Sequence, residues 1–302
     1  MDNGSGEKSI NSIKDKFPGI NILLNGANLG FAKAHNLAIE SHDFDYYMPL
    51  NPDIILESDF VTEMVKAIES DYLVGSVNGK LFFLNSRGEK TDYLYSAGHE
   101  FDRARRASNR GYKQRDSVKF ANACFIFGAN GAAPLYKREF FDATKIAGGY
   151  FDNDFFMYGE DLDLGWRGIL FGFKCLYAPK AVAYHYGFGS NGLKNKSIQY
   201  QYERNRFICV YKNDLAHFFW ADLPILLFHE LFNLCFYLVS SPGRVIQYFR
   251  ALIGFIRMIP IKKKERAEIM SRMKIDEATL RAFYMNPWFC KLLKRRTAFN
   301  IE

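Results

Sequence analysis

Cysteine is sparse and unpaired in this 302-residue sequence. Its five cysteines are odd in number and widely spaced, and no Cys-x-x-Cys pair occurs. This spacing argues against a zinc-binding fold and against a framework of disulfide bonds. We therefore expect reduced thiols and a cytosolic compartment.

Three further absences limit the class of protein. Residues 1–7 are polar, whereas a signal peptide needs an apolar central stretch, so no signal peptide is expected. Leu, Ile and Phe dominate residues 220–260, but no 18 consecutive residues there are free of charge, so we do not expect a simple transmembrane helix. A Gly-rich, basic phosphate-binding loop is missing near the start, which disfavours a nucleotidyltransferase.

The composition is that of a folded protein with an uneven charge. Hydrophobic residues make up 48% and charged residues 24%, and the length allows one large α/β domain with an appendage. Residues 203–302 carry 17 Lys and Arg against 9 Asp and Glu, whereas residues 1–202 carry 23 against 24. A basic C-terminal third fits nucleic acid or an anionic membrane surface. The apolar sequence beside it favours the membrane, and we predict no nucleic-acid partner.

Apolar runs alternate with helical periodicity over the first 84 residues. The pattern predicts a buried strand at 20–24 and further strands at 46–50, 72–77 and 80–84. It predicts helices at 31–41 and at 58–68, the second capped by Ser58. This rhythm predicts an α/β fold with a mostly parallel sheet and helices on both faces.

The middle of the chain contains a basic segment and a small-residue turn. Residues 86–117 hold many Arg and Lys and few aliphatic residues, which predicts a mobile loop or small hairpin. This segment is either a solvated surface loop or a loop that folds over an anionic substrate. A buried strand is expected at 125–127, and it leads into the turn 128–133, where another molecule could approach the backbone closely.

The C-terminal region predicts two amphipathic helices within residues 220–260, interrupted at Pro242-Gly243. We expect them to lie in a membrane interface, with Lys262-Lys263-Lys264 and Lys294-Arg295-Arg296 contributing about 1 kcal/mol per base with anionic lipid. The alternative is a helical subdomain packed on the core. The chain would then divide into a domain at 1–215 and a helical, basic region at 216–302.

Two short acidic motifs, 108 positions apart, carry the strongest chemical signal. Leu50-Asn51-Pro52-Asp53 follows one apolar run, and Tyr158-Gly159-Glu160-Asp161-Leu162-Asp163 follows another. Ligands of open α/β sheets bind outside the carboxyl ends of the strands, where these motifs are expected. One acidic group could hold a divalent metal while the other acts as a base, and this division suits transfer of a group from a diphosphate.

Five motifs in this order resemble the family 2 glycosyltransferases of the GT-A fold, and most closely the bacterial rhamnosyltransferase-like branch. They are Asp2-Asn3-Gly4-Ser5, Asn28-Leu29-Gly30-Phe31-Ala32, Leu50-Asn51-Pro52-Asp53, Phe155 to Asp161, and His185. The resemblance covers about residues 1–215. It implies inverting transfer of a sugar from a dTDP- or UDP-sugar, assisted by Mg²⁺ or Mn²⁺. The implied acceptor is a glycan or lipid-linked saccharide of the cell surface, reached at the inner face of the cytoplasmic membrane.

The resemblance also assigns roles to individual residues. Asp53 matches the metal-binding acid of the family's Asp-x-Asp motif, with Asn51 in place of the first acid. Asp161 matches the general base, with Glu160 beside it as a second catalytic candidate, and His185 matches a metal ligand. Binding of the nucleotide sugar is assigned to Asp2, Asn3, Gly30, Asn36, Asn51 and Gly131.

Structural alternatives stay open for most of these residues. Asn51-Pro52-Asp53 could be a plain turn in which Asp53 caps the next helix, and a lone histidine such as His185 is often structural. Asp163 could face solvent or cap its helix. Arg167 and Arg204 could contact phosphate or lie on the surface.

The resemblance further implies that a strand and helix normally precede Asp2, so the first βα unit is expected to be missing. Either the start site is misassigned, or a short and less active form is real. Two other functions compete with the enzyme: a non-catalytic remnant that binds a nucleotide sugar or glycan, and a membrane-associated scaffold.

Overall fold

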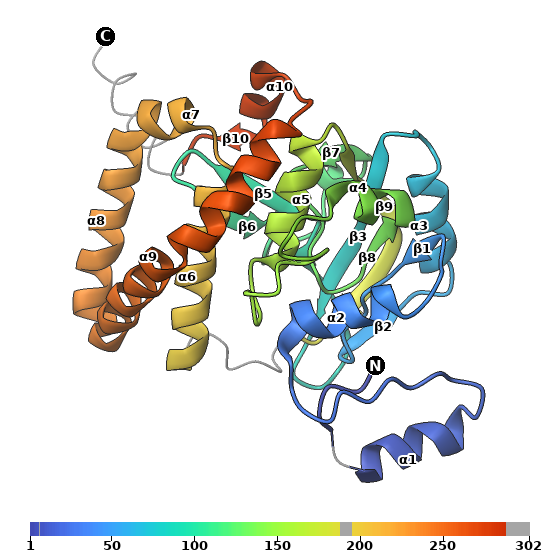
Figure 1. Cartoon of the computed structure of the whole chain (residues 1–302). Helices are drawn as coiled ribbons and strands as arrows, with labels where there is room; N and C mark the ends of the chain where they lie inside the picture. Colours follow the sequence, from blue (N-terminus) through green and yellow to red (C-terminus); the bar gives the residue numbers. More distant parts are fainter. Residues whose placement is uncertain (6, 188–194, 288–302) are drawn as a thin grey trace.

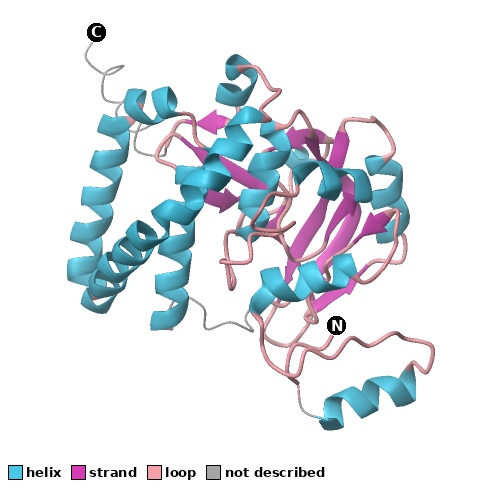
Figure 2. Cartoon of the chain, viewed as in Figure 1, coloured by secondary structure: helices cyan, strands magenta, loops and turns pink. Residues whose placement is uncertain are grey.

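The computed structural model describes residues 1–5, 7–187 and 195–287 and shows a mixed α/β fold with a central sheet flanked by helices (Figures 1 and 2). The helices are α1 Glu7–Lys16, α2 Gly30–Glu40, α3 Phe60–Ile68, α4 Arg138–Thr144, α5 Glu160–Leu170, α6 Lys196–Asn213, α7 Ala216–Ala221, α8 Leu223–Ser240, α9 Pro242–Ser271 and α10 Glu277–Ala282, with a 3₁₀ turn, η1, at Val118–Phe120. The strands are β1 Tyr46–Tyr47, β2 Ile54–Leu56, β3 Val74–Leu84, β4 Lys90–Ser96, β5 His99–Asp102, β6 Ala107–Asn109, β7 Cys124–Ile126, β8 Pro134–Lys137, β9 Lys174–His185 and β10 Tyr284–Met285.

The main sheet is mixed rather than mostly parallel. Its strand order is β1-β8-β3-β9-β2, with β4 on β3 and β7 on β9. Within the described strands of this sheet, β3 and β9 run parallel and the other pairs are antiparallel. The predicted α/β class is confirmed, but the predicted strand direction is wrong. Two parallel strands need a long crossover connection, and the chain between β3 and β9 includes α4 and α5. By contrast, a short hairpin joins β3 to the antiparallel strand β4.

Helices cover both faces of the β3–β9 pair. On one face, α3 buries Phe60, Met64 and Ile68 against both strands. On the other face, the ring of Phe140 from α4 lies between Gly75 of β3 and Gly168 of α5, and a Cβ atom at either glycine would come within 2.6 Å of that ring. These glycines therefore allow α4 and α5 to pack closely on the sheet (Figure 1).

The first predicted strand is wrong, whereas the helix after it is confirmed. Residues 20–24 form no strand, and a single bridge joins Leu24 to Asp2. The side chains of Ile20 and Leu24 are at least half exposed, because no described strand or helix covers them. The predicted helix at 31–41 is α2, which begins one residue earlier.

Several predicted boundaries shift. The strand predicted at 46–50 shortens to β1, and the two predicted at 72–77 and 80–84 are the single long strand β3. The next helix, α3, begins after Asp59 rather than at Ser58, and no side chain caps it. The strand predicted at 125–127 is β7, but Phe125 is half exposed because β7 lies at an edge of the sheet.

Residues 86–117 are not a mobile loop, although a hairpin is present. They form β4, β5 and β6, and β5 and β6 join β10 in a second sheet. The Arg105 guanidinium is buried and contacts Asp214 at 2.8 Å and Asp222 at 2.6 Å. Arg103 also bonds Asp222. These guanidinium groups therefore connect the second sheet to the C-terminal helices rather than facing an anionic substrate.

The C-terminal region is helical as predicted, with the interruption at Pro242. The helix α9 continues through Pro260 to Ser271, beyond the predicted end. Within the described part of the chain, α8 is the one helix whose length and composition would allow it to cross a membrane. The two predicted basic clusters differ: Lys263 and Lys264 are exposed but Lys262 is buried, and residues 294–296 lie outside the described residues.

Candidate active site

The turn at residues 128–133 brings the two acidic motifs together. The backbone N–H of Asn51 donates to the Ala132 carbonyl at 2.9 Å, and the N–H of Gly131 donates to Asp161 Oδ2 at 2.8 Å. A Cβ atom at residue 131 would lie 3.2 Å from that carboxylate oxygen, so glycine allows the close approach. The predicted residues Asn51, Gly131 and Asp161 therefore belong to one site.

Strand register places Asp53 beside His185. Ile54 pairs with His185 across β2 and β9, and the Tyr186 N–H donates to the Asp53 carbonyl. As a result, Oδ1 of Asp53 lies 3.1 Å from Nε2 of His185. The two predicted metal ligands are neighbours in space although 132 positions separate them in the sequence.

This pair has the donor chemistry of a cation site. Burial lowers the pKa of His185 and outweighs the opposing effect of Asp53, which favours the neutral imidazole that binds metals. Two donors on adjacent positions of an octahedral Mg²⁺ lie about 3 Å apart, since each metal–oxygen bond is about 2.1 Å. Mg²⁺ sites usually take one or two carboxylates and complete their shell with water and substrate phosphates. Asp53 supplies the carboxylate of that pattern, whereas the imidazole of His185 is a nitrogen ligand of the kind that transition metals take more readily than Mg²⁺.

Asp161 lies in the first turn of α5 and accepts hydrogen bonds at both oxygens. Nε2 of His99 lies 3.0 Å from Oδ2, which also accepts from Gly131, while Oδ1 accepts from the Leu162 N–H at 2.8 Å. His99 comes from β5, and the sequence analysis missed it. No motif marks this histidine, and the basic segment around it was predicted to be a mobile loop or a small hairpin.

Glu160 and Asp161 are adjacent carboxylic acids with different environments. Burial, followed by the charge of Asp161, raises the pKa of Glu160 to about 8, and its Oε2 has no hydrogen-bond partner among the described residues. Burial also raises the pKa of Asp161, but the charge and hydrogen bond of His99 and the two backbone N–H groups outweigh it and hold that pKa below its usual range. At neutral pH, Asp161 is ionised and Glu160 is protonated, which identifies Asp161 as the candidate base.

A strained turn positions both acids. Tyr158 and Gly159 have φ angles of +68° and +91° directly before α5. A tyrosine in this left-handed region costs about 1–3 kcal/mol, and such strain persists only where the surroundings hold it. Nδ2 of Asn205 in α6 donates to the carbonyls of Met157 and Tyr158 at 3.0 and 2.7 Å. The helix α6 therefore helps to fix the place where Glu160 and Asp161 begin α5.

Tyr95 lies beside His185 and was also missed by the sequence analysis. Its ring lies edge-on to His185, with 4.2 Å between the ring centroids. Burial raises the pKa of the Tyr95 hydroxyl to about 12, and the charges of Asp161 and Asp53 add to this effect. Both carboxylates are thus close enough to Tyr95 for their charge to act on its hydroxyl.

The other predicted nucleotide-sugar ligands have structural contacts. The Asn3 side chain bonds Asn28 and the Leu29 backbone, and the carboxylate of Asp2 accepts from the N–H groups of the following turn. Gly30 has φ +79°, and a Cβ there would collide with Phe156. Asn36 is buried, with its amide bonded to the Phe151 backbone. These contacts are structural, and binding of the nucleotide sugar by Asp2, Asn3, Gly30 and Asn36 stays a prediction.

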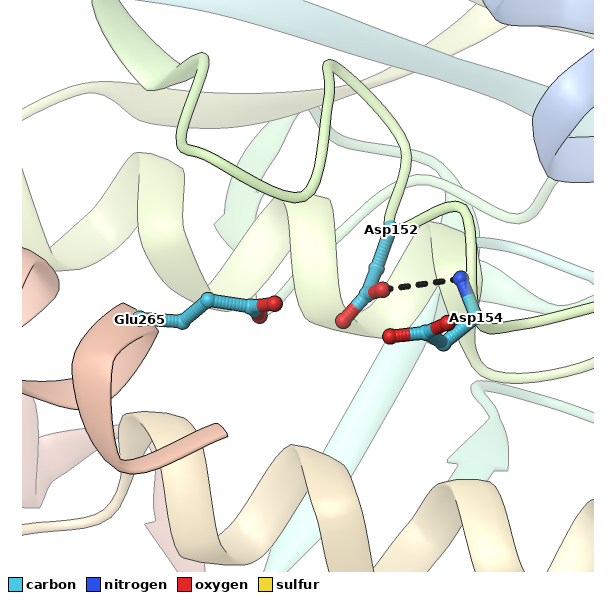
Figure 3. A group of neighbouring side chains, drawn as sticks. All are labelled: Asp152, Asp154 and Glu265. Carbon is cyan, nitrogen blue, oxygen red and sulfur yellow. Dashed lines mark hydrogen bonds between the residues drawn. The ribbon is translucent and has the colours of Figure 1, made fainter. Parts of the chain in front are cut away.

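A second acidic cluster consists of the buried Asp152 and Glu265 and the exposed Asp154 (Figure 3). Their carboxylate oxygens come within 4.8 Å of one another, a spacing that could hold a metal ion. However, Nζ of Lys262 lies 2.7–2.8 Å from an oxygen of each of the three. Nζ of Lys212 lies 2.6 Å from Asp152 as well. Ammonium groups occupy the place of a cation, so this cluster is an ion-pair network and not a metal site.

The contacts in this region bear on four smaller predictions. Asp163 does not face solvent, because it is buried against Lys212 and Arg167. Arg167 is buried too, and bonds backbone carbonyls rather than phosphate. Arg204 bonds the Asp154 carbonyl and the Asn205 side chain. Lys262 lies inside the protein and cannot contact lipid.

Comparison with known proteins supports the fold. No protein-family model matches the sequence, and no curated protein matches it. Among solved structures, GalNAc-T7 with UDP, GalNAc and Mn²⁺ has a TM-score of 0.51 and 14% identity, over 68% of this chain and 39% of that one. TarS of S. aureus has a TM-score of 0.50 and 15% identity, over 90% of this chain and 47% of that one. A mannosyltransferase of Pyrobaculum calidifontis with GDP-Man and Mn²⁺ has a TM-score of 0.48 at 14% identity, over 90% of this chain and 74% of that one.

These likenesses define the class of fold and no more. The two structures with a TM-score of 0.50 or above are glycosyltransferases of the GT-A fold, and this chain shares that fold. The chain spans less than half the length of either protein.

Proposed function

We propose that this protein is a glycosyltransferase that moves a sugar from a nucleotide diphosphate to a hydroxyl acceptor with a divalent metal ion. The observation that carries the proposal is one constellation: the Asp53–His185 pair and the ionised Asp161, linked through the turn at 131–132. GalNAc-T7 and TarS, which have the same fold, support it, and the former was solved with UDP and Mn²⁺.

In this proposal, Asp53 and His185 hold Mg²⁺ or Mn²⁺, which would neutralise the charge of the leaving diphosphate. Asp161 removes the proton of the acceptor hydroxyl. The electron pair of that oxygen then forms the new bond to the anomeric carbon, while the bond to the diphosphate breaks and its electrons leave with the diphosphate. Attack from the face opposite the leaving group inverts the anomeric centre. A well-placed base contributes about 10²–10⁴-fold to the rate.

Our proposal for the donor is dTDP-rhamnose, on the resemblance to the rhamnosyltransferase-like branch of family 2. UDP-linked galactose, glucose or N-acetylglucosamine are the alternatives. The proposed acceptor is a glycan or lipid-linked saccharide of the cell envelope. We place the protein in the cytoplasm on the inner face of the membrane, supported by the exposed apolar side chains of α8 and α9.

Calorimetry with UDP and dTDP, each with and without Mn²⁺, tests the donor site. We expect metal-dependent binding of one nucleotide by the wild-type chain and its loss in Asp53→Ala. Asp59→Ala, an exposed carboxylate close in sequence, is the matched control and should bind like the wild type. A longer form should be tested beside it if the gene encodes more sequence upstream.

The alternatives give different results. Hydrolysis of the bound donor in the presence of metal supports the enzyme, whereas metal-dependent binding without turnover supports a non-catalytic remnant. Lipid binding without affinity for either nucleotide would support the membrane scaffold and contradict our proposal.

A further inference from the structure

The contact between His99 and Asp161 belongs to the candidate site, and the sequence did not predict it. Its Nε2 is 3.0 Å from Oδ2 of Asp161, and both side chains are largely buried, with 10% and 15% of their surface exposed. A residue in this position controls the environment of the proposed base.

The backbone holds His99 firmly against Asp161. Its N–H donates to the Gly128 carbonyl at 2.7 Å, and it pairs with Asn109 across β5 and β6. Gly128 and Gly165 of α5 approach each other closely, since a Cβ at Gly165 would lie 3.1 Å from the Cα of Gly128. The turn, β5 and α5 thus meet at the point where His99 faces Asp161.

The two oxygens of the Asp161 carboxylate accept different numbers of hydrogen bonds. Each carboxylate oxygen has two lone pairs. Oδ2 uses both, one toward His99 and one toward the Gly131 N–H, whereas Oδ1 accepts one bond from Leu162. One lone pair, on Oδ1, stays available to an incoming proton.

From this geometry we infer that His99 is a positioning residue: it fixes the Asp161 carboxylate through Oδ2, so that Oδ1 is the atom that accepts the proton of the acceptor hydroxyl. The inference rests on the proposed function. His99 donates Nε2–H to Oδ2 and does not touch the substrate. Its Nδ1 is buried without a partner among the described residues, so Nε2 is the ring nitrogen that reaches the carboxylate.

The role has a pH signature, because His99 stabilises the ionised form of Asp161. Other titratable groups act on Asp161 from the elements around it: Glu160 on α5, Tyr95 on β4, Tyr136 on β8 and Cys209 on α6. At neutral pH these groups are uncharged, since the pKa of each lies above 7. His99 is therefore the side chain whose loss should raise the pKa of Asp161 most.

Donor turnover should be measured from pH 5 to 9 for the wild type, His99→Phe and His99→Gln. Phenylalanine removes the donor, and we expect the acidic limb of kcat/KM to move to higher pH, since a hydrogen bond to the ionised carboxylate favours that form and is lost in the variant. The wild-type advantage should therefore grow as the pH falls. Glutamine keeps an N–H donor and should restore part of the rate. The KM for the donor should not change.

Exposed His42→Phe is the control for the substitution itself. A merely structural role predicts a rate loss that is equal at every pH and is not rescued by glutamine, and this result would overturn the inference while leaving the proposed function intact. If the wild type turns over no donor with metal, the proposed function fails and this role fails with it.

A second readout does not need turnover. Nitrogen-15 NMR of the histidine rings should show His99 protonated at Nε2 in the wild type, with that signal shifted in Asp161→Asn. An unprotonated Nε2 in the wild type would contradict the inference even in an active enzyme.

Discussion

Glu160 and Asp161 show, at the scale of single residues, how the fold assigns roles that a sequence motif leaves open. Both acids were candidates for catalysis. Among the residues that the structure describes, the buried Oε2 of Glu160 has no hydrogen-bond partner, whereas Asp161 accepts three hydrogen bonds. The motif supplied both carboxyl groups, but only the partners from β5 and the 128–133 turn distinguish them.

The raised pKa of Glu160 has a consequence for stability. The pKa of Glu160 is about 8 in the folded protein against its ordinary value of about 4.5, so the folded state binds the proton more tightly. Between about pH 4.5 and 8, the unfolded chain has lost this proton and the folded chain retains it. The free energy of unfolding therefore falls as the pH rises through this window, by up to about 1.4 kcal/mol per pH unit for one proton.

Glu160→Gln should remove this slope, because glutamine has a similar shape and no titratable proton. We expect the variant to gain stability over the wild type as the pH rises from 5 to 8. Urea unfolding at several pH values measures the difference, with the exposed Glu139→Gln on α4 as the matched control. Parallel pH profiles for wild type and Glu160→Gln would show that Glu160 is ionised in the folded protein.

Ion pairs decide the arrangement at the scale of helices. Lys262 of α9 and Lys212 of α6 share Asp152, and Lys212 also reaches Asp163 of α5. This network joins three helices behind the candidate site. The sequence placed Lys262 in a run of three lysines, which predicted a solvated basic face. A helix turns about 100° per residue, so the three lysines point in different directions and one of them faces the interior.

Lys262→Met tests this network. Removing one partner of a buried ion pair costs about 3–5 kcal/mol, because the other charge is left uncompensated. We expect a loss of about 3 kcal/mol in the free energy of unfolding, at the low end of this range, because Lys212 still pairs with Asp152. Lys263→Met, at the exposed neighbouring position, should change stability by no more than about 0.5 kcal/mol. Equal effects of the two substitutions in urea unfolding would contradict the buried network.

The arrangement of the whole molecule bears on membrane attachment. Apolar side chains are exposed along α8 and α9, namely Leu227, Leu231, Leu238, Val239, Ile246, Phe249, Ile253 and Ile256. Arg250, Arg257 and Lys264 of α9 follow one another at intervals of seven residues beside the apolar stripe. Figure 1 shows α8 and α9 on the opposite side of the molecule from α3. A bilayer touching α8 and α9 would therefore leave α3 on the side of the molecule that faces away from the lipid.

Flotation with lipid vesicles measures this attachment. We expect the protein to float with vesicles that contain phosphatidylglycerol, and the bound fraction to fall in Arg250→Glu/Arg257→Glu, since each base contributes about 1 kcal/mol near an anionic surface. Arg87→Glu/Arg115→Glu makes the same change in charge at exposed positions far from α8 and α9 in the sequence, and should float like the wild type. Equal flotation of the two double variants, or none by the wild type, would contradict attachment through α9.

Local sequence patterns determined the α/β class, the helix α2, the break between α8 and α9, and the positions of both acidic motifs. These features depend on periodicity and on residues close together in the chain. Tertiary structure alone decided the strand directions, the partners of the carboxylates and the burial of Lys262. The register of β2 on β9 sets Asp53 against His185, and β5 brings His99 to Asp161. Such contacts join residues 62 to 132 positions apart, and no local pattern encodes them.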